Sequence, residues 1–84
     1  MFPVSDVKES LERARMVSQV LSLTVSGNTL FVQSTMASDP KESDNLHKQG
    51  QACINKANSI REAFWAQFPK AFIPPSCPWM QRNG

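Results

Sequence analysis

Apolar and polar positions alternate most regularly in the second half of the chain. Between Leu46 and Phe68, apolar residues recur four and three residues apart, and polar residues such as Lys48, Asn55 and Glu62 fall on the opposite side. This stripe consists of Leu46, Gly50, Cys53, Ala57, Ile60, Phe64 and Phe68. Such a repeat is typical of a helix that packs along one side. The pattern predicts a helix on the order of 40 Å long, at ~1.5 Å per residue.

The ends of this helix carry residue types that favour starting or stopping. Asp39 stands at the N-cap, where its carboxylate can accept a hydrogen bond from the first turn, and Pro40 follows at the first helical position. Glu42 completes a capping-box pattern. Pro69 disfavours helical geometry at Phe68. We therefore expect the helix to run from about Pro40 to about Phe68.

A second helical pattern begins near Ser5, in the segment SDVKESLERARMV. Ser5 or Asp6 can cap this helix, and Glu9 and Arg13 form a favourable pair one turn apart. Its apolar stripe consists of Val7, Leu11, Ala14 and Val17 or Ser18. The segment predicts a short amphipathic helix.

The next segment, LSLTVSGNTLFVQS at residues 21–34, fits two structures. As a β-hairpin it turns at Gly27 and Asn28. One face of that ribbon would collect Leu21, Leu23, Val25, Leu30 and Val32. As a helix it would continue the first helix and form an antiparallel helical hairpin with the last one. The stripe of that helix would be Val17, Val20, Leu21, Val25, Asn28 and Val32.

Residue propensity favours the β-hairpin. Valine, threonine and phenylalanine prefer a pleated surface, and Gly27 with Asn28 would cost a helix ~1.5 kcal/mol relative to alanine. We therefore predict an α+β fold: a short helix, a β-hairpin and a long C-terminal helix. The alternative is an all-α antiparallel helical hairpin. Residues 1–68 form a single small domain, and residues 69–84 form a tail rich in proline and aromatic residues.

Charge is distributed unevenly along the chain. Residues 1–44 have a net charge of −2, whereas residues 45–84 have a net charge of +4 and offer a mildly basic surface to an acidic protein. Residues 16–40 contain no lysine or arginine. A DNA-reading ribbon without cations is a poor candidate, so nucleic acid is not the expected partner. A small dimeric DNA-binding regulator is kept as the alternative function.

Motifs of enzymes, cofactor sites and metal sites are missing from the sequence. Cys53 and Cys77 have no ligand-like neighbours and are interpreted as reduced thiols, with a disulfide between them as the alternative. No apolar run is long enough to span a bilayer, and the N-terminus lacks the order of a secretory signal. We expect a cytoplasmic, non-enzymatic protein without cofactors.

Large aromatic residues cluster toward the C-terminus. Phe64, Trp65, Phe68, Phe72 and Trp79 fall within 16 residues. Aromatic and arginine side chains are common anchors of protein–protein interfaces. The tail either folds back over the domain or waits for a partner. The predicted partner-binding residues are Lys56, Arg61, Trp65, Phe72, Trp79 and Met80.

These features predict a small protein-interaction module, an inhibitor, adaptor or chaperone that occludes a surface of a larger protein. A chain of 84 residues has a small core, so we also expect a homodimer. Small domains of this kind are common among phage and mobile-element proteins that block host machinery. We therefore expect such an origin, on the basis of size and the absence of catalytic chemistry and not of any motif. The ASDP turn superficially resembles that of helical-hairpin secretion needle proteins, which polymerise. The short first helix and the proline-rich terminus argue against that function.

Overall fold

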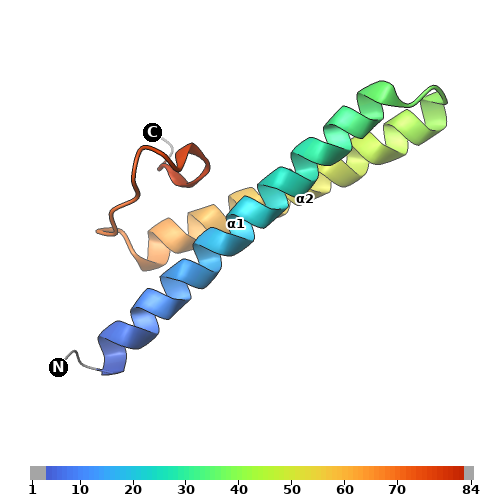
Figure 1. Cartoon of the computed structure of the whole chain (residues 1–84). Coiled ribbons are helices and arrows are strands. Elements are labelled where there is room, and N and C mark those ends of the chain that lie inside the picture. The colour runs from blue at the N-terminus through green and yellow to red at the C-terminus, as the bar shows by residue number, and fades with distance from the viewer. Residues whose placement is uncertain (1–3, 83–84) are drawn as a thin grey trace.

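The protein is an antiparallel pair of long helices with a C-terminal tail folded against it (Figure 1). The structure is a computed structural model that describes residues 4–82. Helix α1 covers Val4–Met36 and helix α2 covers Pro40–Gln67. A single 3₁₀ turn, η1, covers Pro78–Met80. The molecule is elongated, with extents of 58 × 26 × 20 Å.

The predicted α+β fold is wrong, and the all-α alternative is the observed architecture. Residues 21–34 lie inside α1, and the described residues 4–82 contain no strand. Gly27 does not form a turn. It lies opposite Gly50, and a Cβ atom built on Gly27 would stand 3.0 Å from the Gly50 carbonyl oxygen. Close helix packing therefore explains this glycine, and that packing outweighs the strand propensity of its neighbours.

Hydroxyl side chains in this part of α1 bond to the helix backbone. The Thr29 Oγ1 donates to the carbonyl oxygen of Val25 at 2.9 Å, and the Thr35 Oγ1 donates to that of Val32 at 2.7 Å. Threonine is a weak helix former partly because its hydroxyl competes for backbone groups. Here the two threonine hydroxyls bond to carbonyl oxygens of α1 without interrupting the helix.

The buried face of α1 differs from the stripe predicted for it. Met16, Val20, Gly27 and Ser34 are buried, at spacings of four and seven residues. The stripe predicted for α2 is confirmed, because Gly50, Ala57, Phe64 and Phe68 are buried. The core therefore lies along the line where these two faces meet.

The predicted helix start at Asp39 is confirmed. The Asp39 Oδ1 accepts a hydrogen bond from the Lys41 backbone N–H at 3.1 Å, with Pro40 at the first helical position. Beside this turn, Ser34 and Ser43 each donate a side-chain hydrogen bond to the other's carbonyl oxygen, both at 2.8 Å. These bonds hold the end of α1 to the beginning of α2.

The tail folds back over the open end of the helix pair. Met80 is fully buried, and its carbonyl oxygen accepts a hydrogen bond from the Trp65 Nε1 at 2.8 Å. The Gln81 side-chain amide donates to the carbonyl oxygen of Pro74 at 2.9 Å. The Arg82 Nη2 donates to that of Pro69 at 2.6 Å, and its guanidinium lies 4.7 Å from the Trp65 ring centre. The tail is therefore part of the folded unit.

Candidate protein-binding surface

One side of α1 exposes a row of mostly apolar side chains, which we call the outer face. Its large residues are between 40% and 77% exposed. They are Val7, Leu11, Leu21, Val25, Val32 and Met36. The smaller residues Ala14, Ser18 and Asn28 lie between them and are also exposed. Their spacing of three and four residues is that of a helix seam that packs against another helix.

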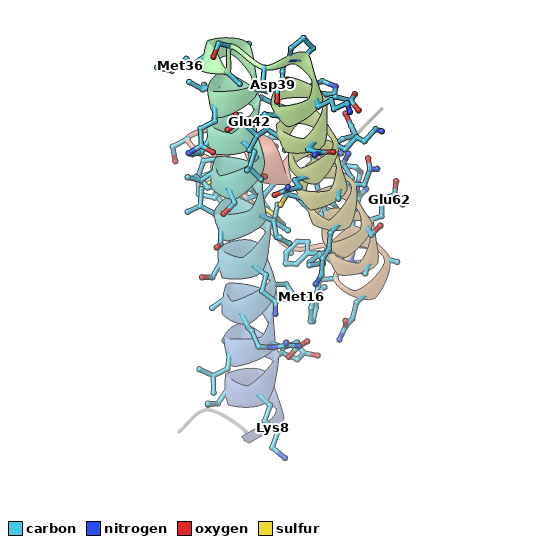
Figure 2. All side chains as sticks on the ribbon, turned by 90° about the vertical axis from the view of Figure 1, so that its right-hand side faces the viewer. Lys8, Met16, Met36, Asp39, Glu42 and Glu62 are labelled. Carbon is cyan, nitrogen blue, oxygen red and sulfur yellow. The ribbon has the colours of Figure 1, made fainter. Side chains whose placement is uncertain are left out.

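The outer face lies far around the helix from α2. Three outer-face residues each follow a buried residue of α1 by five positions, namely Leu21, Val25 and Val32. Five positions correspond to about 140° around a helix of 3.6 residues per turn. In Figure 2, Met16 points toward α2, whereas the large residues of the outer face are exposed. Helix α1 therefore has two apolar faces, and α2 covers one of them.

The outer face is uncharged over most of its length. Residues 16–38 contain no lysine, arginine, aspartate or glutamate. Charges on α1 begin at Arg15 and continue toward the N-terminus. Arg15 bonds to Glu12 through two nitrogen–oxygen contacts of 2.5 and 3.1 Å. This hydrogen bonding lowers the pKa of the Glu12 carboxyl and raises the pKa of the Arg15 guanidinium.

A groove of about 690 Å³ runs along the flank of the outer face. One wall is α1, including Ala14, Ser18 and Leu21, and the other wall is the tail segment 70–74. The charged residues in its lining are Arg13 and Lys70, both cations. Phe72, on the tail wall, is 82% exposed. The groove therefore adds an apolar wall with cations to the N-terminal half of the outer face.

The predicted partner-binding residues do not form one surface. Met80 is fully buried, and Trp65 is half-buried and bonded to the Met80 backbone. Trp79 is half-buried, and its Nε1 is buried with no hydrogen-bond acceptor among the described residues. Phe72 is the aromatic residue of this set that stands free on the surface. Met80 and the two tryptophans thus pack against their own chain.

The two predicted cations also lie apart. Lys56 is exposed and borders a small hollow with Ser22 of α1. Arg61 is half-buried and borders a different hollow with Trp65 and Arg82. Neither hollow opens onto the outer face of α1, so the cations do not extend that surface.

The described residues offer little sign of a metal site, a disulfide or a membrane-spanning helix. Among residues 4–82, no cluster of histidine, cysteine and acidic side chains has the composition of a metal site. Cys53 and Cys77 are both free and half-buried, so the interpretation as reduced thiols fits and the alternative disulfide is absent here. Within the same described part of the chain, neither helix is long and apolar enough to cross a membrane.

Part of the outer face coincides with the apolar stripe predicted for the first helix. The stripe predicted for the first helix began with Val7, Leu11 and Ala14, and all three are exposed. The signal that separates the two faces is Gly27, whose partner is the glycine on the α2 stripe, Gly50. In this protein, these two glycines lie on the faces that meet.

Comparison of the chain with protein-family models, with curated proteins and with solved structures gives no match. The outer face of α1 is therefore the main indication of function.

Proposed function

We propose that the protein is a non-enzymatic protein-interaction module that uses the outer face of α1 to cover an apolar surface of a larger protein. In this function it acts as an inhibitor, adaptor or chaperone. The observation that supports the proposal most is the exposed row from Val7 to Met36. Contiguous apolar patches on a small protein mark interaction sites, because leaving them in water is unfavourable.

The chemistry of the face indicates the kind of partner surface. A straight apolar row at three- and four-residue spacing fits the groove between ridges of another helix. The uncharged stretch from residue 16 to residue 38 fits an apolar partner surface better than a charged one. Phe72 and the cations Arg13 and Lys70 border the N-terminal half of the row. These three residues suit a partner with acidic side chains beside its apolar anchor.

A DNA-binding regulator is not proposed. That alternative depended on a β-ribbon over residues 21–34, and this segment is helical. Helix α1 carries no cation after Arg15 with which to contact phosphate.

Affinity capture from a cell extract with a matched pair of variants tests the proposal. Val25→Lys places a charge on the outer face, whereas Ser26→Lys places the same charge one residue away on a different side of the exposed helix. We expect Ser26→Lys to retain the captured protein and Val25→Lys to lose it. Circular dichroism of both variants checks that the helices remain folded. A partner retained equally by both variants would exclude the outer face as the binding surface.

A further inference from the structure

We infer that, when no larger partner is present, a second copy of this chain covers the outer face, with the two α1 helices antiparallel and centred near Leu23. This inference rests on the proposed function, because it assigns an occupant to the same face. It adds that the free protein is a symmetric dimer whose interface a larger partner must displace. Three properties of the face support a second copy.

The first property is charge. A face that pairs with itself must not bring like charges together. Residues 16–38 carry no charged side chain, so two copies approach without repulsion over this stretch. In the antiparallel arrangement, the charged turns around Glu12 and Arg15 lie beside the uncharged half of the second α1. A parallel arrangement would instead place these turns beside their own copies.

The second property is the matching of side-chain sizes. The residues of the outer face recur at alternating steps of three and four, which gives two kinds of seam position. In an antiparallel helix pair, a residue at one kind of position faces a residue at the other kind. Centring the pair near Leu23 places Leu21 against the second copy's Val25, and the symmetry repeats this contact. Farther out, Ala14 lies against Val32 of the second copy. A small residue then faces a larger one, which is the arrangement that fills space between helices.

The third property is a polar pair at the same level of the seam. In this register Ser18 faces Asn28 of the second copy, twice by symmetry. Both side chains are exposed in the single chain, and both can donate and accept hydrogen bonds. A polar residue in an apolar seam fixes the register, because a slipped arrangement would bury it against apolar groups. The outer ends of the seam then pair Leu11 with the segment at Met36.

Sedimentation equilibrium of the purified chain tests the dimer. We expect twice the chain mass of 9.4 kDa at micromolar concentration. Val25→Lys should raise the dimer dissociation constant by at least about tenfold, because it places two charges near the centre of an apolar seam. Ser26→Lys should change it by less than about twofold. A monomer, a higher polymer, or a dimer indifferent to Val25→Lys would overturn the inference.

A spin-label distance separates the antiparallel arrangement from the parallel one. Lys8→Cys, in a chain with Cys53→Ala and Cys77→Ala, carries one label at the free end of α1 (Figure 2). The antiparallel register separates the two labelled backbones by roughly 45 Å, at ~1.5 Å per residue. A parallel pair separates them by about 10 Å. The short distance would overturn the proposed arrangement, whatever the mass.

The two proposals fail in different ways. A monomeric purified chain whose capture of a larger protein still depends on Val25 removes the second copy and leaves the proposed function standing. A dimer that depends on Val25, combined with capture that does not, removes the proposed binding surface and leaves the dimer.

Discussion

The two ends of the helical hairpin are packed by opposite means. Near the turn, α1 and α2 approach so closely that Gly27 and Gly50 face each other, and Ser34 and Ser43 exchange hydrogen bonds. At the other end the helices diverge, and the tail lies against them (Figures 1 and 2). There, buried Met80 supplies volume that the helices do not. Near the turn, close packing depends on glycines, which have no side chain. At the open end, it depends on the tail, which adds a packed segment.

This difference predicts opposite sensitivities. The turn end has no room for added atoms, so enlarging a residue there is expected to destabilise the fold. The open end depends on atoms contributed by the tail, so deleting atoms there is expected to destabilise it.

The largest effect is expected for Met80→Ala at the open end. Met80 is fully buried and lies in the cluster formed by Met16, Val20 and Phe64. Truncation of a buried methionine leaves a cavity, and we expect a loss of about 3 kcal/mol in the free energy of unfolding. Chemical denaturation at fixed protein concentration measures it. Phe72→Ala, in the same tail but 82% exposed, is the control and should change stability by less than about 0.5 kcal/mol. Equal losses would mean that the tail is not packed as described.

The next largest effect is expected for Gly50→Ala at the turn end. Its added Cβ would stand 2.8 Å from the Phe31 ring and 3.0 Å from the Gly27 carbonyl oxygen. The gain of ~1 kcal/mol in helix propensity is smaller than the cost of overpacking, so we expect a net loss of about 2 kcal/mol.

Gly27→Ala should cost less, about 1 kcal/mol, because its nearest neighbour is the flexible end of Ile54. Ser26→Ala, exposed on the same helix, should leave stability unchanged or slightly raised. A rise in melting temperature for both glycine variants would show that the helices are not in close contact here.

These glycines also show how far the sequence could be interpreted. The capping signals at Asp39 and Pro40 and the stripe of α2 predicted that helix to within one residue at its C-terminal end. Glycine favours both a tight turn and a close helix crossing, so Gly27 alone does not distinguish the two structures. Only the position of Gly50 on the other helix decides between them. A single segment considered alone lacks that information.

The outer face could not be identified from the sequence for a related reason. Both faces of α1 repeat at helical spacing, so periodicity alone cannot say which of Val20 and Val25 faces α2. The tail residues were ambiguous because large aromatic side chains serve equally as interface anchors and as core. Trp65 packs inward because its Nε1 reaches the Met80 carbonyl oxygen, a contact between residues fifteen positions apart.

A pair of tryptophan variants examines the open end more finely. Trp65→Phe removes the donor to the Met80 carbonyl oxygen, a bond of 2.8 Å, and should cost about 1 kcal/mol. Trp79→Phe removes a buried Nε1 that has no acceptor among the described residues. That change should be neutral or stabilising, because it removes an unsatisfied polar group. Both variants lose the same ring volume, so denaturation curves of the two isolate the hydrogen bond. A larger loss for Trp79→Phe would contradict this account of the tail.

The smallest effect is expected at the N-terminal turns of α1, which extend beyond α2 (Figure 2). These turns are stabilised neither by the close glycine contact nor by the tail. There the hydrogen bonds from Arg15, and to a lesser extent its charge, lower the pKa of the Glu12 carboxyl below its ordinary value of 4.5. A lowered pKa in the folded chain means that the pair stabilises these turns above the unfolded pKa, and that this support is lost as pH falls through the folded pKa. Carbon chemical shifts of residues 7–15 should therefore report a small loss of helicity in acid, with Glu12 titrating below its ordinary pKa. Glu12→Gln should remove that pH dependence while leaving the turn end of the hairpin unchanged. A Glu12 that titrates at or above its ordinary pKa would show that the contact with Arg15 does not persist in solution.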